Sequence, residues 1–166
     1  MRAPTGTLGC FADLVAAVAA QGLPHRAVAP QVEVQVHRPP VVGAITLIWS
    51  AQVPTVQLLH VIAHPPANRP ALLDAIARIN HALPRPGFGL APDGDALYFR
   101  LVLARRRGTD DLAAAAIGPA LTAVIDAVAA FAPVLAEVAR GARPADQAVR
   151  ARPAQATGAA FDWIVE

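Results

Sequence analysis

The segment Pro39–Asn68 most constrains the fold of this chain, because it is mostly apolar and contains no Asp, Glu, Lys or Arg. Such a segment can form a membrane helix or buried strands. Its first apolar run, Val41–Ala51, has about half of the roughly 20 residues that a membrane-spanning helix needs, and Gln52 and Pro54 interrupt it before the next run. The segment therefore predicts two adjacent strands and no membrane helix.

Strand patterns on both sides of Pro39-Pro40 predict three consecutive strands. Gln31–His37 alternates valine with polar residues, which indicates a strand with one buried face. Val41–Gln52 and Val56–His64 are apolar on both faces, which is typical of strands at the centre of a sheet. We expect Pro39-Pro40 to separate the first strand from the other two.

A helix and a hairpin follow these strands. The helix has Asn68 or Arg69 as its expected cap. Its apolar positions recur every three or four residues, at Leu72, Ile76, Ile79 and Leu83. The hairpin strands are expected at Phe88–Leu90 and Leu97–Leu103, because Asp93-Gly94 between them is a strong turn signal.

Residues Met1–Gln21 favour an amphipathic helix over a signal peptide, because Asp13 interrupts the apolar region that a signal peptide needs. The apolar positions of this helix are Leu8, Phe11, Leu14, Val15 and Val18. Cys10 is the single cysteine, and with no cationic neighbour in sequence it is expected to be a buried, unreactive thiol.

A second long apolar stripe predicts a C-terminal helix that begins at Thr109 or Asp110 and ends at Arg140-Gly141. The stripe consists of Ile117, Leu121, Val124, Val128, Phe131, Leu135 and Val138. Gly118-Pro119 and Pro133 interrupt it, so we expect either a short helix followed by a long one or a single kinked helix.

The elements together predict an α+β fold with the order helix, three strands, helix, two-stranded hairpin and long C-terminal helix. One mainly antiparallel sheet is packed by the helices. With 55% hydrophobic residues and a net charge of +2, residues 1–141 are expected to form a single domain, and a cytoplasmic location fits this composition. Residues 142–166 are an Ala-, Pro- and Arg-rich tail that ends in an apolar, strand-like peptide.

This arrangement resembles the YbjN-like family, whose fold looks like that of type III secretion chaperones. The resemblance spans about Val32 to Gly141, and its motifs are Arg69-Pro70-Ala71-Leu72-Leu73, Arg78-Ile79-Asn80-His81-Ala82-Leu83-Pro84, Gly87-Phe88-Gly89-Leu90, Asp93-Gly94-Asp95-Ala96-Leu97-Tyr98-Phe99-Arg100 and Phe131-Ala132-Pro133-Val134-Leu135. It implies a non-catalytic domain, often dimeric, which in the secretion chaperones holds an extended segment of another protein. YbjN-like members are described as regulators of stress or motility responses.

Residues that carry chemistry are few. His60 and His64 would suit a metal on a helix, but on a strand their side chains lie about 13 Å apart, so no metal site, cofactor or catalytic residue is predicted. The alternative is a small-ligand-binding protein or enzyme with a histidine-containing pocket. His25 is expected on a loop and lies far from this pair in sequence.

Arg105-Arg106-Arg107 is the one dense cluster of charge, and weak nucleic-acid binding through it is the second alternative. Asp110 and Asp111 partly cancel this charge, and no aromatic residues are interleaved with it, so a nucleic-acid partner is not expected.

The apolar strands raise the question of what covers the second face of the sheet, because three helices in a chain of this length fully cover one face. Two answers are open: a second subunit or a client segment covers that face, or the protein's own helices and tail wrap the sheet on both sides. The predicted function is a non-catalytic protein-binding module, as a homodimer, that holds an extended segment on its sheet or in a dimer groove. The residues expected to bind the partner, or to occupy its groove from the C-terminal peptide Phe161–Glu166, are Trp49, Tyr98, Arg100, Phe161 and Trp163.

Overall fold

The computed structural model describes residues 6–52, 55–62, 68–83, 87–92, 96–104 and 112–148. Its helices are α1 (Phe11–Ala19), α2 (Arg69–Ala82) and α3 (Ile117–Ala139), with short 3₁₀ turns η1 (Ala114–Ala116) and η2 (Ala145–Gln147). Its strands are β1 (His25–Val28), β2 (Gln31–Arg38), β3 (Val41–Ser50), β4 (Thr55–Ile62), β5 (Phe88–Leu90) and β6 (Leu97–Ala104).

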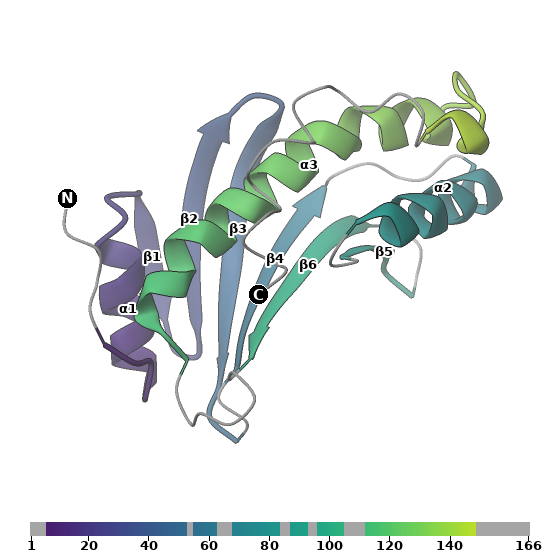
Figure 1. The fold of residues 1–166 in the computed structure, drawn as a ribbon. Coiled ribbons are helices and arrows are strands. Elements are labelled where there is room, and N and C mark those ends of the chain that lie inside the picture. The colour runs from purple at the N-terminus through teal and green to yellow at the C-terminus, as the bar shows by residue number, and fades with distance from the viewer. Residues whose placement is uncertain are drawn as a thin grey trace.

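The six strands form one antiparallel sheet in the order β1-β2-β3-β4-β6-β5 (Figure 1). This confirms the α+β class and the central place of β3 and β4. The strand β1 was not predicted, and His25 begins it instead of lying on a loop. All four of its residues are exposed, so the segment lacks the apolar alternation by which a strand is recognised in sequence.

The helices all lie on one face of this sheet (Figure 1). α3 crosses β3, β4 and β6, α1 lies near β1, and α2 lies beside α3 and β5. Because side chains alternate between the faces of a strand, every second residue points toward the helices. These inward residues form the core, as shown by Val34, Ile45 and Leu58, each of which is fully buried.

The long helix α3 carries most of this packing. It begins at Ile117, and the 3₁₀ turn η1 precedes it, whereas the expected caps Thr109 and Asp110 lie outside the described residues. Pro119 falls in the first turn, where no N–H donor is needed, and the exposed Pro133 lies inside the helix without ending it.

The stretch Ala114–Ala139 is also long and apolar enough, by length and composition only, to cross a membrane. Half of its most apolar window is buried inside the protein. The residues that face the sheet, among them Val124 and Phe131, are buried, so packing on the sheet explains the apolar stripe.

The connection from α2 to β5 is fixed by one side chain. The Asn80 amide donates to the Phe88 carbonyl at 2.8 Å, and its oxygen accepts from the N–H groups of Gly87 and Phe88, both at 3.1 Å. The Phe88 ring then packs edge to face against Phe99 and Phe131, with centroids 4.8 and 6.0 Å away. Asn80 therefore attaches the edge strand β5 to α2.

At the amino end, α1 starts one residue after Cys10, and the expectation of a buried thiol is wrong because Cys10 is exposed. Its S–H group donates to the Asp13 carboxylate at 3.2 Å, and the N–H groups of Gly9 and Cys10 donate to the same oxygen. These hydrogen bonds lower the pKa of Asp13, the Cys10 side-chain bond contributing most. Cys10 is thus part of the helix start, outside the core.

Candidate binding surfaces

The face of the sheet opposite the helices is a first candidate surface, here called the helix-free face. Its centre on β3 and β4 is uncharged and includes the polar Thr46 and Gln57. Three valines on β3, β4 and β6 have large exposed fractions: Val42 at 56%, Val61 at 52% and Val102 at 43%. Ile48 and Leu59 are half-buried between them. In the described part of the chain no helix lies on this face, whereas residues 149–166 of the tail lie outside the described residues.

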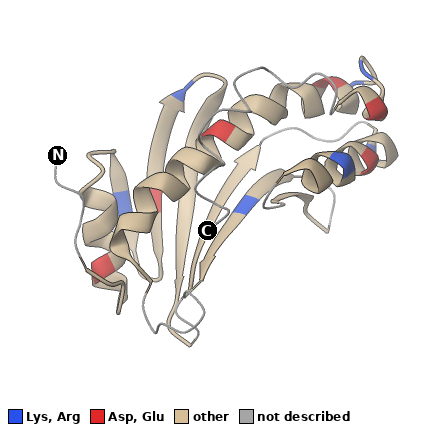
Figure 2. Cartoon of the chain, viewed as in Figure 1, with Lys and Arg blue, Asp and Glu red and all other residues tan. Residues whose placement is uncertain are grey.

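Charged side chains lie only at the margins of this face. The described residues of β3 and β4 carry no charge, and the charged positions of the sheet fall on β1, β2 and β6 (Figure 2). Glu33 of β2 and Arg100 of β6 project from the helix-free face, because their cross-strand partners Thr46 and Leu59 do so. An uncharged centre with charged residues on the flanking strands fits the depletion of charge at the core of protein interfaces.

The predicted partner-binding residues divide between the two faces. Tyr98 and Arg100 lie on the helix-free face, opposite Val61 and Leu59. Trp49 lies opposite Val56 on the helix-covered face, where it is only 8% exposed. The expectation of one groove near Trp49, Tyr98 and Arg100 is therefore corrected, since a side chain on one face of a sheet cannot line a groove on the other.

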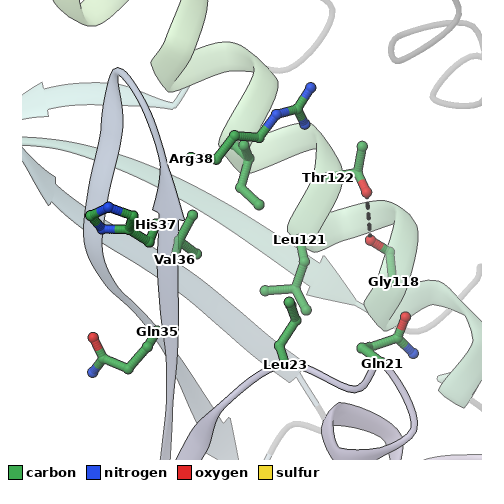
Figure 3. Close-up of a pocket in the computed structure, with 10 residues that line it drawn as sticks. Gln21, Leu23, Gln35, Val36, His37, Arg38, Gly118, Leu121 and Thr122 are labelled. Atoms are coloured by element: carbon green, nitrogen blue, oxygen red, sulfur yellow. Dashed lines mark hydrogen bonds between the residues drawn. The ribbon is translucent and has the colours of Figure 1, made fainter.

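A second candidate surface is a groove between the edge of β2 and helix α3, here called the edge groove. Its cavity has a volume of about 390 Å³ and is lined by Gln21, Leu23, Gln35, Val36, His37, Arg38, Gly118, Leu121, Thr122 and Ile125. Figure 3 shows Leu23 and Leu121 directed toward each other, with Val36 turned to the same side and Gln35 and His37 turned away. The lining thus joins an apolar floor to a polar strand edge.

Contacts at both ends of the edge groove keep it in shape. At one end, Arg38 of β2 forms an ion pair with Asp126 of α3 at 3.6 Å. At the other, the turn after α1 reaches α3 at Gly118, where a Cβ atom would lie 2.5 Å from the Gln21 side-chain oxygen. This contact is made by the end of the flexible Gln21 side chain, which approaches α3 where Gly118 has no Cβ atom.

The edge of β2 beside the groove offers unpaired backbone groups. The last cross-strand pair with β1 is His25 with Val34, after which the Gln35 N–H donates to the Pro24 carbonyl at 2.9 Å. Pro24 has no N–H to return that bond. By the alternation of a strand, the N–H and C=O of His37 point to the same edge, and no residue of β1 lies opposite them.

The histidines do not form a metal site in the described residues, where no group of three or more His, Cys, Asp or Glu can hold an ion. His60 is 3% exposed on the helix-covered face, and its Nδ1 lies 3.0 Å from the Ala44 carbonyl oxygen. His37 and His81 are exposed on different elements. His64 lies outside the described residues, so the histidine-pocket alternative stays a prediction.

Three other predicted features also lie outside the described residues. These are the Arg105–Arg107 cluster, Phe161 and Trp163. The sequence did not single out the edge groove at all, because it forms where β1 stops short of the end of β2. Proline at position 24 is a signal by which that stop could have been found.

Comparisons of this chain with protein-family models, with curated proteins and with solved structures find no match.

Proposed function

We propose that this protein is a non-catalytic protein-binding module that holds an extended segment of a partner protein in the edge groove. The observation that carries the proposal is the unpaired edge of β2 beside an apolar cavity. A peptide strand added there continues the line of β1 beyond Pro24, with its N–H and C=O groups paired to those of His37.

The chemistry of the groove selects the type of segment that fits. A strand placed next to β2 turns alternate side chains toward α3, where Leu23, Leu121 and Ile125 form an apolar wall. The remaining side chains face solvent and can be polar. The preferred client is therefore an extended segment in which apolar and polar residues alternate.

The chain itself carries such a segment. In Phe161–Glu166, the apolar residues Phe161, Trp163 and Val165 alternate with Asp162, Ile164 and Glu166. This peptide is a suitable probe for the groove, and in the full chain it competes with a client for the same place.

The proposal is tested by fluorescence anisotropy with a labelled peptide of residues 161–166. The protein is the full-length chain carrying Phe161→Ser and Trp163→Ser, so that its own tail does not compete. We compare His37→Pro, which removes the N–H at the open edge, with His37→Ala, which keeps it. Proline is tolerated on an edge strand whose N–H faces solvent, so the fold is expected to survive.

We expect the His37→Pro change to weaken peptide binding at least tenfold and the His37→Ala change to have little effect. A scrambled peptide of the same composition without alternation should bind more weakly than the native one. Equal binding by the proline and alanine variants, or no binding of the native peptide, would contradict strand addition at this edge.

A further inference from the structure

Three charged residues project from the helix-free face, Arg26 of β1, Glu33 of β2 and Arg100 of β6, and they lie in one row across five strands. In the register of the sheet, Glu33 is opposite Thr46, Thr46 is opposite Leu59, and Leu59 is opposite Arg100. Three strand spacings of about 4.8 Å put Glu33 and Arg100 about 14 Å apart, too far to pair within one chain. Neither forms an ion pair with another described residue, although Arg26 is the cross-strand neighbour of Glu33 on β1.

We infer that the helix-free face is covered by a second copy of this chain, related by a two-fold axis parallel to the strands between β3 and β4. This operation exchanges β2 with β6 and β3 with β4 while keeping each row in place. Glu33 of each copy then faces Arg100 of the other, so that two equivalent ion pairs form between the copies.

The same operation sets apolar side chains against polar ones next to the charges. Leu59 of one copy meets Thr46 of the other, and Ile48 meets Gln57. Val61 and Val102, two of the three exposed valines on this face, are then removed from water. Two sheets packed face to face in this way lie about 10 Å apart, with their strands within about 30° of each other.

The area fits a dimer of modest affinity. Four strands at about 4.8 Å spacing, each about 26 Å long at eight residues, give a footprint of about 500 Å² per copy. The total of about 1,000 Å² lies at the lower limit for a specific interface. The dimer is therefore expected to dissociate on dilution, and the charge pairs decide how readily it does so.

This inference does not rest on the proposed function. The edge groove opens toward α3, and of its lining residues Gln35 and His37 carry their side chains on the face that the second copy covers. Peptide binding at the edge and dimerisation through the face can each fail without the other.

The test is sedimentation equilibrium of the full-length chain over a range of concentrations, with circular dichroism to confirm that each variant is folded. We compare Glu33→Arg and Arg100→Glu with a charge reversal elsewhere, Asp146→Arg, on the exposed turn η2. Each interface variant places like charges opposite each other across the dimer, and we expect each to raise the dimer Kd at least tenfold. Asp146→Arg should leave the Kd unchanged.

Mixing the two interface variants gives the sharper result. The Glu33→Arg chain is positive at both positions and the Arg100→Glu chain is negative at both, so each contact between the two different chains is attractive. We expect the mixture to form a heterodimer, and the double variant carrying both changes to form a homodimer again.

The inference is overturned if the unaltered chain stays monomeric at all concentrations, since the face is then open in solution. It is also overturned if the single variants dimerise as the unaltered chain does, or if the mixture stays monomeric while both chains are folded. Either of these last two results would mean that Glu33 of one copy does not lie opposite Arg100 of the other.

Discussion

Replacing Asn80 by alanine tests how the far edge of the sheet is held. The change removes the bond to the Phe88 carbonyl and the two bonds from the N–H groups of Gly87 and Phe88. At a net value of about 1 kcal/mol for each bond, Asn80→Ala should lower the free energy of unfolding by about 3 kcal/mol. With a slope of about 2 kcal/mol per molar urea, the unfolding midpoint falls by about 1.5 M.

Urea unfolding followed by circular dichroism measures this change, and Asn80→Asp is the matched control. Aspartate keeps both acceptor bonds to the backbone N–H groups, but at neutral pH it sets a carboxylate oxygen against the Phe88 carbonyl. Protonation of that carboxyl group in acid restores a donor, so Asn80→Asp should recover part of its stability relative to the unaltered chain at low pH, and Asn80→Ala should not. A loss below about 1 kcal/mol for Asn80→Ala would show that these hydrogen bonds form equally well with water, and the argument for Asn80 as the attachment of β5 would fail.

Three further changes test the core, the start of α1 and the tail. Phe131 is 1% exposed, so Phe131→Ala should cost about 3–5 kcal/mol in urea unfolding, and a loss under 1 kcal/mol would contradict its place in the core. The pKa of Asp13 is lowered from 3.8, so the stability it contributes is present above that value and is lost as pH falls through the folded pKa. Asp13→Asn should therefore lower the melting temperature at neutral pH and match the unaltered chain in strong acid; parallel curves at all pH values would refute this. Trp49→Phe leaves Trp163 as the single tryptophan, and docking of the tail predicts an emission maximum blue-shifted from that of the free peptide, which His37→Pro reverses. An unshifted spectrum would remove the tail from the groove.

Local patterns in the sequence determined most of the elements. The alternation of Gln31–His37, the uncharged runs that became β3 and β4, and the spacing of Leu72 to Leu83 each depend on contacts that repeat along one element. Asn68 is the cap of α2 as expected, since its side chain accepts from the Ala71 N–H at 3.5 Å. Such signals are local, and they predict the elements correctly because the apolar face of each element in the sequence is the face that is buried in the structure.

What the sequence left undecided is how surfaces from distant segments combine. From the sequence, Trp49, Tyr98 and Arg100 were expected to bind one partner together. The alternation of side chains along the paired strands instead puts Trp49 on the opposite face from Tyr98 and Arg100. Whether a residue faces the helices depends on which face the helices cover, and that choice is made by the packing of α3 on the sheet. No periodicity within one strand records it.

The sequence by itself determined the α+β class, the central place of the uncharged strands and the apolar stripes of the helices, because each follows from the period of one element. Only the tertiary structure decided that all three helices cover one face, that β1 begins opposite Val34 and leaves the edge of β2 beyond it open, and that Glu33 and Arg100 share a row. These features arise from the register between strands far apart in the chain, which is fixed by side-chain packing across the whole sheet.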